Sequence, residues 1–228
     1  MIISHKHKFI FIKTNKTAGT SVEIALSRFC GPDDIITPIS PSDEALRKGK
    51  GFTTAQNYQV PRRAFSKAVD ALFFRHPKKL FFNHMSADRI RALVAPETWD
   101  GYFKFCIERN PWDRVISSYF WKNKQEPRPT ILEWLENGGH MILQKRGREL
   151  YTIDGDIVAD RIVRFENLNG DLEEIRLKLG LPEPLDLPHA KSGTRKDKRH
   201  YREILGEKER RIIERDFAFE INRFGYSF

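Results

Sequence analysis

Apolar residues in this chain form short continuous runs that alternate with helically spaced positions. The run Phe9–Ile12 is apolar throughout and predicts a buried strand. Polar residues occupy most of 13–21 directly after it. An apolar face then repeats at the spacing of a helix, in the residues Val22, Ala25, Leu26 and Phe29. The pattern therefore predicts a strand, a polar turn and a helix, in that order.

A second apolar segment, Tyr102–Ile107, has the same arrangement. It ends at Glu108 and Arg109, and Asn110 then suits the N-cap of a helix whose first residue is Pro111. The predicted helix has an apolar side made of Trp112, Val115, Ile116, Tyr119 and Phe120. The sequence therefore predicts a second strand–turn–helix unit, with Arg109 at the carboxyl end of its strand.

The rest of the chain also alternates between strand and helix patterns. Further strands are predicted at Lys79–Asn83 and Arg161–Phe165. Further helices are predicted at Ser86–Val94, Thr130–Asn137, Asp171–Leu179 and Glu207–Phe224. Gly31–Gln59 and Pro182–Arg202 are expected to be long loops or lids. This alternation favours an α/β fold with three α/β/α layers and a mainly parallel central sheet, in a single domain over residues 1–228.

The polar turn after the first strand has the chemistry of an anion site. The helix that follows directs backbone N–H groups and the positive end of its dipole toward the turn. Lys16 adds a full charge, and Gly19 allows an anion to approach the backbone. The nucleotide loop of ATPases and GTPases has its lysine after the last glycine, whereas Lys16 precedes Gly19. The turn is therefore P-loop-like but of another kind; the alternative is a basic turn that is polar only for solubility.

Arg109 and Ser117 are the candidate ligand-binding residues of the second unit. An arginine fork suits a phosphate group, and Ser117 lies about two turns along the predicted helix. The alternative is a surface arginine paired with Asp113 or Glu108. Spacing alone does not choose between these interpretations.

The two units together carry a resemblance to a known family. Residues 16–21, Lys-Thr-Ala-Gly-Thr-Ser, resemble the 5′-phosphosulfate loop of sulfotransferases that use 3′-phosphoadenosine 5′-phosphosulfate (PAPS). Arg109, followed by Ser117, is similar to the 3′-phosphate motif of the same family. One residue departs from the pattern, because Asn15 stands where the family usually has proline.

Later segments carry the same resemblance. Val163–Leu168 with Leu179–Leu181 is similar to a strand-and-helix signature in the second half of these enzymes. The ending, Phe217–Phe228, resembles the close of the carbohydrate, or Golgi-type, branch. The match is poor over Pro32–Lys79. The chain thus resembles a short, soluble, bacterial member of that branch.

The resemblance implies a sulfotransferase that moves a sulfuryl group from PAPS to an acceptor hydroxyl of a carbohydrate or another compound, with 3′-phosphoadenosine 5′-phosphate as the product. The implied nucleotide-binding residues are Lys16, Thr17, Ala18, Gly19, Thr20, Ser21, Arg109, Ser117, Arg195 and Lys196. Lys16 would also be catalytic, because it would stabilise the leaving phosphate. No metal is implied, since Lys16 and the helix N-terminus take its place.

His84 is the implied base that deprotonates the acceptor. It follows the strand predicted at Lys79–Asn83, and its ordinary pKa suits proton transfer near neutral pH. Because ligands bind beyond the carboxyl ends of the strands in an open α/β sheet, Lys16, His84 and Arg109 should converge on one crevice. The alternatives are that His84 caps the next helix or makes a core hydrogen bond, and that a carboxylate is the base.

Composition leaves two other classes open. The net charge of +9 favours an anionic partner such as a nucleotide, an acidic glycan, nucleic acid or a membrane surface, or simply keeps the protein soluble. A magnesium-dependent kinase is one alternative, and the missing nucleotide-loop sequence disfavours it. A non-catalytic basic module for acidic polymers is the other. Its weakness is that the polar residues concentrate at strand ends, so no nucleic-acid partner is expected.

Cysteine content and hydropathy bear on location. Cys30 and Cys106 both lie in apolar segments and predict core thiols rather than a disulfide framework. The apolar run Phe9–Ile12 is too short for a signal peptide, and no stretch approaches the length of a transmembrane helix. A cytoplasmic enzyme is therefore expected.

Overall fold

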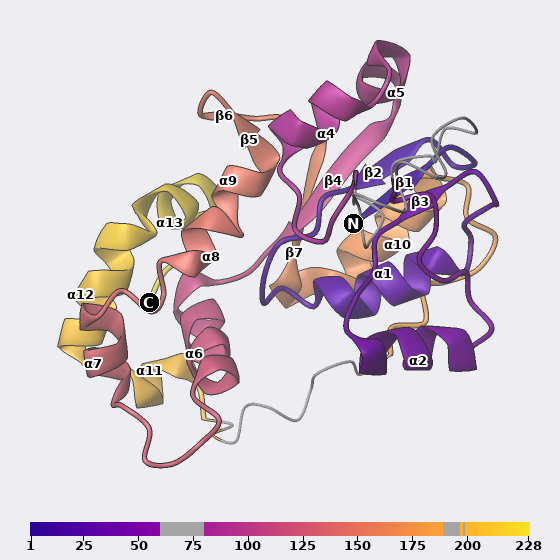
Figure 1. The fold of residues 1–228 in the computed structure, drawn as a ribbon. Helices are drawn as coiled ribbons and strands as arrows, with labels where there is room; N and C mark the ends of the chain where they lie inside the picture. The colour runs from indigo at the N-terminus through magenta and orange to yellow at the C-terminus, as the bar shows by residue number, and fades with distance from the viewer. Residues whose placement is uncertain (60–79, 189–196, 198) are drawn as a thin grey trace, which may run out of the picture.

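A five-stranded sheet organises the fold of this protein, whose computed structural model describes residues 1–59, 80–188, 197 and 199–228 (Figure 1). The strands are β1 (Ile2–Ser4), β2 (Phe9–Phe11), β3 (Ile35–Ile36), β4 (Phe103–Glu108) and β7 (Arg161–Arg164), in the spatial order β3-β1-β2-β4-β7. The predicted strand–turn–helix units supply β2 and β4, which lie side by side and parallel.

The sheet is mixed, so the expectation of a mainly parallel sheet is only partly right. β2, β4 and β7 are parallel, but β1 pairs in antiparallel fashion with both β2 and β3. The connection from β1 to β2 is a short turn over residues 5–8 in which Lys8 has φ 53°. So short a connection joins antiparallel neighbours only.

Helices surround the sheet and extend beyond it. In the first half they are α1 (Gly19–Ser27), α2 (Pro41–Gly49), α4 (Ala87–Leu93), α5 (Pro96–Gly101) and α6 (Pro111–Lys122). In the second half they are α7 (Ile131–Glu136), α8 (Ile142–Lys145), α9 (Arg148–Tyr151), the 3-10 turn η1 (Phe165–Asn167), α10 (Leu168–Lys178), α11 (Tyr201–Ile204), α12 (Glu207–Asp216) and α13 (Ala218–Phe224). A small hairpin, β5 (Thr152–Ile153) and β6 (Asp156–Ile157), follows α9.

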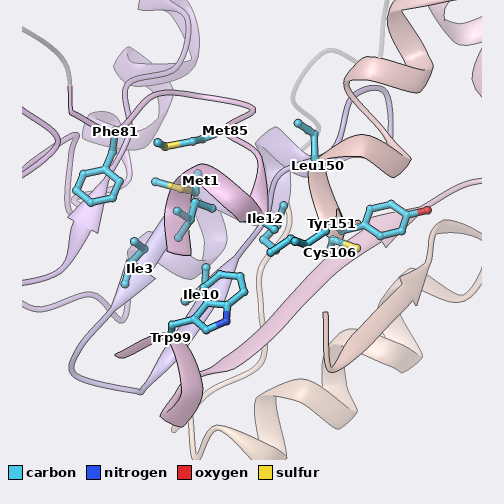
Figure 2. Packing of buried hydrophobic residues seen from close by; sticks show 13 residues of the cluster. Met1, Ile3, Ile10, Ile12, Phe81, Met85, Trp99, Cys106, Leu150 and Tyr151 are labelled. Carbon is cyan, nitrogen blue, oxygen red and sulfur yellow. The ribbon is translucent and has the colours of Figure 1, made fainter. Parts of the chain in front are cut away.

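Side chains of β2 alternate between the two faces of the sheet, as the pleat requires. Phe9 and Phe11 belong to a cluster that includes residues of α1 and α10. Ile10 belongs to a second cluster with residues of α4, α5 and α9, among them Trp99 and Tyr151 (Figure 2). Helices therefore cover both faces of the sheet. A third cluster joins α6 to α7 and to the C-terminal helices, and it buries the whole predicted apolar side of α6.

Some predicted elements differ from the structure. Leu80–Asn83 form no strand, because the N–H groups of Leu80 and Phe81 both donate to the carbonyl oxygen of Tyr58. The predicted helix over 207–224 is interrupted at Phe217, which has φ −116° and is fully buried in the third cluster. The expected loop 31–59 contains β3 and α2, and α2 begins at a proline behind the capping hydroxyl of Ser40.

Other elements agree with the patterns. α4, α7 and β7 lie where helices and a strand were predicted, and α10 begins three residues before the predicted Asp171. Neither thiol is in a disulfide, and Cys106 is buried while Cys30 is half-buried. Of the loop predicted at 182–202, residues 182–188 contain no helix or strand, but Tyr201 and Arg202 already belong to α11, so the loop ends earlier than predicted. Its basic residues Arg195 and Lys196, expected at the nucleotide, lie outside the described residues.

Candidate functional site

The turn between β2 and α1, here called the Lys16 turn (residues 13–18), has an unusual backbone. Lys16 and Ala18, on either side of Thr17, have φ 64° and 61°. Such left-handed values are uncommon for residues other than glycine and are concentrated at functional sites. Alternation of left- and right-handed residues turns successive N–H groups toward one concave side, which binds anions. α1 then begins without a side-chain cap and without an acidic residue in its first turn.

Close packing explains two residues of the predicted motif. A Cβ atom on Gly19 would lie 2.9 Å from Cγ of Lys13, so only glycine lets α1 start this near the end of β2. The Thr17 side chain is fully buried, and its hydroxyl lies 2.8 Å from that of Thr14. The hydroxyl of Thr14 donates in turn to the carbonyl oxygen of Ile107. The Thr17 hydroxyl is therefore linked to β4 through Thr14. Only the backbone of Thr17 remains available to a ligand.

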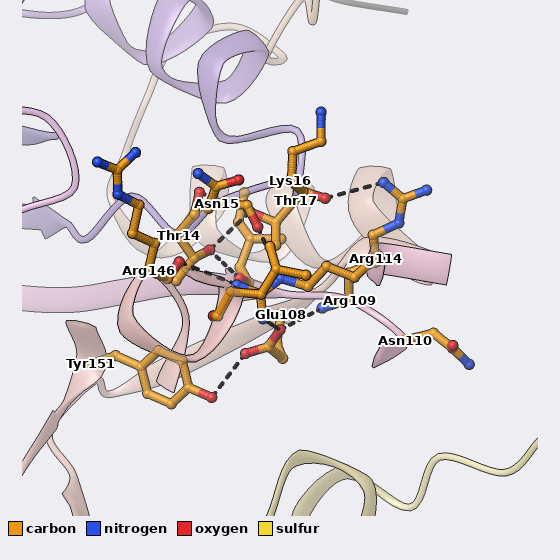
Figure 3. A network of polar contacts seen from close by, with 12 residues as sticks. Thr14, Asn15, Lys16, Thr17, Glu108, Arg109, Asn110, Arg114, Arg146 and Tyr151 are labelled. Atoms are coloured by element: carbon orange, nitrogen blue, oxygen red, sulfur yellow. Dashed lines mark hydrogen bonds and ion pairs between the residues drawn. The ribbon is translucent and has the colours of Figure 1, made fainter. Parts of the chain in front are cut away.

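Arg109 connects the second predicted unit to this turn (Figure 3). Its Nη1 donates to the carbonyl oxygen of Lys16 at 3.1 Å, and its Nε donates to Asp113 at 2.9 Å. The guanidinium also lies 4.0 Å from the centre of the Phe165 ring. Arg109 thus pairs with Asp113, as one interpretation expected, and also borders the Lys16 turn, as a ligand-binding arginine would. Asn110 caps α6 as predicted, by accepting from the N–H groups of Trp112 and Asp113.

One side of α6 borders the Lys16 turn. Asp113, Ser117 and Trp121 are spaced four residues apart, which places them in a row along the helix, and all three are half-buried. Nζ of Lys16 lies 4.7 Å from the centre of the Trp121 ring. Arg109, held by Asp113, reaches the carbonyl oxygen of Lys16 from the other end of the row. Ser117 therefore lies between two contacts with the turn. Thr20 and Ser21 lie in the first turn of α1, where Thr20 is half-buried and Ser21 is buried.

A buried ion pair beneath the turn was not predicted. Nη1 of Arg114 donates to Glu108 at 2.7 Å, and its Nε donates to the carbonyl oxygen of Asn15 at 2.9 Å. The second carboxylate oxygen of Glu108 accepts from the hydroxyl of Tyr151 at 2.9 Å. The side chains of Arg114 and Glu108 are 1% and 0% exposed. The available sequence signal was a charged residue at the end of a largely apolar strand and another beside the apolar side of a helix, because such residues are rarely buried unless paired.

The same network extends to the segment between α8 and α9. Nη2 of Arg114 donates to the carbonyl oxygens of Leu143 and Arg146, each at 3.2 Å. The N–H group of Asn15 donates to the carbonyl oxygen of Arg146 at 2.7 Å. Gly147 is required here, since a Cβ atom would lie 2.6 Å from Nη2 of Arg114. The Lys16 turn is therefore supported from β4, from α6 and from the α8–α9 segment.

His84 meets the turn from the segment before α4. Its Nδ1 lies 2.8 Å from the carbonyl oxygen of Lys13. Because a carbonyl oxygen only accepts, Nδ1 carries the proton and Nε2 keeps a lone pair. Burial, together with the positive charge of Lys13, lowers the pKa of His84 to about 3. The prediction that a strand delivers His84 is wrong, and a loop residue with φ 58° places it beside the turn instead.

A buried acidic residue holds Lys13 in place. Nζ of Lys13 lies 2.7 Å from the Glu23 carboxylate on α1. Glu23 also pairs with Arg47 of α2 at 3.2 Å and with the amino group of Met1 at 3.1 Å. Burial alone would raise the pKa of Glu23, but these cations outweigh it and lower the pKa to about 2. Glu23 is therefore ionised and anchors the inner side of the turn.

A cavity of about 510 Å³ opens beside His84, bordered by α4, α8, α9 and the β5–β6 hairpin. Its lining is mostly polar, and comprises Phe82, His84, Ser86, Asp88, Arg89, Lys145, Glu149, Leu150, Thr152, Ile153 and Asp154. His84 thus contacts the Lys16 turn through Nδ1 and also lines this cavity. Lys145 and Glu149 come from the same stretch of chain that Arg114 fastens to the turn.

Comparison with known proteins adds the family. The profile described as "Sulfotransferase family" matches residues 1–153, which contain the Lys16 turn, His84 and the β4–α6 unit. A protein of Archaeoglobus fulgidus with the name "Uncharacterized protein" is 32% identical over 108 residues, which are 45% of this chain and 88% of that protein. No solved structure matches this chain. Within the part of the chain that the structure describes, no helix is long and apolar enough to cross a membrane. On the match over residues 1–153, the chain belongs to the sulfotransferase family.

Proposed function

We propose that this protein transfers a sulfuryl group from PAPS to a hydroxyl group of an acceptor, with carbohydrates as the acceptor class. The observation that carries the proposal is the meeting of three side chains at one turn. Arg109 donates to the carbonyl oxygen of Lys16, and His84 donates to that of Lys13. A cation, a phosphate-binding fork and a base in one place are what sulfuryl transfer from a nucleotide requires.

The Lys16 turn fits the phosphosulfate end of PAPS, which supplies the sulfuryl group when bound. The two left-handed residues, the uncapped start of α1 and the close approach at Gly19 form an anion cradle. In this proposal the N–H groups of residues 17–21 bind the 5′-phosphate, and the hydroxyls of Thr20 and Ser21 add donors. Lys16 neutralises the charge that develops on the leaving phosphate oxygen, a role that metal ions have in phosphoryl transfer.

Arg109 and Ser117 bind the 3′-phosphate in this proposal, which distinguishes PAPS from ATP. Arg109 is positioned by Asp113 and by the carbonyl oxygen of Lys16, so its fork is already fixed at the edge of the turn. Ser117 lies in the same row along α6. Arg195 and Lys196, which lie outside the described residues, are proposed as further positive charges for the nucleotide.

His84 takes the proton of the acceptor hydroxyl through Nε2. Its low pKa keeps the imidazole neutral in the free protein. The main opposing charge is that of Lys13, and an anion bound at the turn offsets that charge. Donor binding therefore raises the pKa of His84 toward the range in which a base is effective.

Thermal stability in the presence of nucleotides tests the donor site. At a hundredfold excess over its dissociation constant, 3′-phosphoadenosine 5′-phosphate should add about 2.7 kcal/mol of stability, a shift of several degrees. AMP should stabilise less, and Arg109→Ala should abolish the difference between the two nucleotides. Equal or greater stabilisation by ATP with magnesium would instead favour the kinase class. Transfer of labelled sulfate from PAPS to a panel of carbohydrates then tests the reaction itself.

A further inference from the structure

The cavity beside His84 has a local charge opposite to that of the whole chain. The chain carries a net charge of +9, which favours acidic partners. The cavity is lined by the carboxylates of Asp88, Glu149 and Asp154 and by the cations of Arg89 and Lys145. Its ionised side chains therefore carry a net negative charge. All five of these side chains are exposed, so they act on a ligand at contact range, whereas the charge of the whole chain is spread over its surface and screened by salt.

We propose that this cavity binds a hydroxyl-rich acceptor that bears a protonated amine, such as an amino sugar, and that Glu149 and Asp154 select it over polyanionic acceptors. The proposal rests on the sulfuryl transfer proposed above, because it makes the cavity the acceptor site of that reaction. The link between the two is His84, which lines the cavity and bonds to the Lys16 turn.

Glu149 and Asp154 are the carboxylates available to a cationic ligand. Within the described residues, neither side chain has a hydrogen bond or an ion pair. Asp88 differs, since a hydrogen bond from Ser86 lowers the pKa of its carboxyl group. Arg89 is also engaged, with its guanidinium 5.8 Å from the centre of the Phe82 ring. An ammonium group offers three donors, so it can bond to more than one carboxylate of the lining.

The position of Asp154 is fixed by its turn. Asp154 and Gly155 have φ 53° and 89° and join β5 to β6, an Asp-Gly pair of the kind that favours tight two-residue hairpins. Glu149 lies on α9, and its neighbour Leu150 is buried. The two carboxylates therefore come from two separate segments, the helix α9 and the tight turn between β5 and β6.

The cavity also has apolar side chains, which suit the ring of a sugar. Phe82, Leu150 and Ile153 line the cavity, and the C–H faces of a sugar ring pack against such side chains while its hydroxyls remain among polar groups. A volume of about 510 Å³ falls in the range of sites for small organic ligands. A short oligosaccharide, of up to about three sugar rings, is therefore the size of acceptor that the cavity accommodates.

Three trisaccharides of different charge test the proposal by calorimetry on the full chain in the presence of 3′-phosphoadenosine 5′-phosphate. Chitotriose, at a pH where its amines are protonated, is expected to bind tightest. Its N-acetylated form should bind about tenfold more weakly, and trigalacturonic acid more weakly still. Equal or tighter binding of trigalacturonic acid, or no binding of any of the three, would overturn the proposal.

Matched variants separate selection by charge from general sugar binding. Glu149→Gln and Asp154→Asn should each reduce the preference for chitotriose about two- to fivefold, the size expected for an exposed charge pair. Asp156→Asn is the control, because Asp156 lies in the same hairpin but does not line the cavity. A preference that survives both variants would contradict the roles of Glu149 and Asp154. Nucleotide binding, followed separately by thermal stability, shows whether the donor site rather than this inference has failed.

Discussion

Nδ1 of His84 lies 2.8 Å from the carbonyl oxygen of Lys13, three residues before the lysine that is the proposed ligand of the leaving phosphate. The contact orients the imidazole and fixes its proton on Nδ1. It also places the ring close to the Lys13 charge, which is itself held by Glu23. This one hydrogen bond thus attaches His84, the candidate base, to the turn that is proposed to bind the anion.

Replacing His84 with asparagine tests its role as the base. Asparagine tolerates a left-handed backbone and has an amide that can donate to Lys13, so the fold should survive. The rate of sulfuryl transfer should fall about 10²- to 10⁴-fold, the usual contribution of a general base. Affinity for 3′-phosphoadenosine 5′-phosphate should remain within about twofold. Near-normal turnover of His84→Asn would instead assign the proton transfer to a carboxylate.

The pKa of His84 also predicts how stability responds to acid. The folded protein keeps His84 neutral to about pH 3, whereas in the unfolded chain its pKa is near 6.5. The unfolded state therefore binds one more proton below pH 6.5, and acidification from pH 6.5 toward pH 3 destabilises the fold through this residue. Glu23 acts in a lower window, since its stabilisation is present above pH 4.5 and is lost toward pH 2.

Urea unfolding of the native protein and of His84→Asn at pH 7 and pH 5 isolates the His84 contribution, because the other groups that titrate in this interval, such as the Met1 amino group and Glu220, are present in both proteins. The native protein should lose more stability between the two pH values than His84→Asn. Equal losses in the two proteins would show that the imidazole is not kept neutral by its surroundings.

The catalytic role of Lys16 can be tested with Lys124 as the control, because both lysines lie over the ring of Trp121. Lys16→Met should lower turnover about 10²- to 10³-fold, because a preorganised donor to the leaving group is lost. The side chain extends away from the buried network (Figure 3), so thermal stability should change little. Lys124→Met is the control, since Nζ of Lys124 also lies over the Trp121 ring, at 3.9 Å. Steady-state rates of the two variants should differ by at least tenfold; similar rates would remove Lys16 from catalysis.

Arg114 should affect both stability and nucleotide binding. Arg114→Met leaves Glu108 as a buried, unpaired carboxylate, which typically costs about 3–5 kcal/mol. It also frees the carbonyl oxygen of Asn15, so the turn loses a support. The double variant with Glu108→Gln should recover part of the stability, because the unpaired charge is gone, but not the nucleotide affinity. Denaturant unfolding and calorimetry measure the two effects; full affinity in Arg114→Met would contradict the supporting role.

Local patterns accounted for the elements that carry the proposed donor site. The strand–turn–helix units at residues 9–29 and 102–121, with the capping residue Asn110, follow from apolar spacing and turn chemistry, which are properties of neighbouring residues. The strand β1 was missed because three residues are too few to show a period. The break at Phe217 was missed because a long-range cluster, rather than a local signal, fixes that residue.

In the candidate site, too, the residues in local motifs were predictable and those that depend on distant partners were not. Lys16, Arg109 and Ser117 lie in recognisable local motifs, and all three border the turn. The supports of the turn were not predictable, since Arg114 and Glu23 act through partners that are distant in sequence, such as Leu143 and Arg47. The charge of the cavity was not predictable either. It is the sum of side chains from separate segments, whereas the composition gives only the net charge of the whole chain.

The hydrogen bonds of the Arg146 carbonyl oxygen to the Lys16 turn bear on whether binding of the donor affects binding of the acceptor. The carbonyl oxygen of Arg146 accepts from Asn15 and from Arg114, while its neighbour Lys145 and the nearby Glu149 line the cavity. The segment 143–149 thus lies between the Lys16 turn and the cavity. A displacement of this segment when one ligand binds would therefore alter the site of the other. Donor and acceptor should therefore bind with measurable mutual cooperativity, equal in both directions because binding free energies are linked.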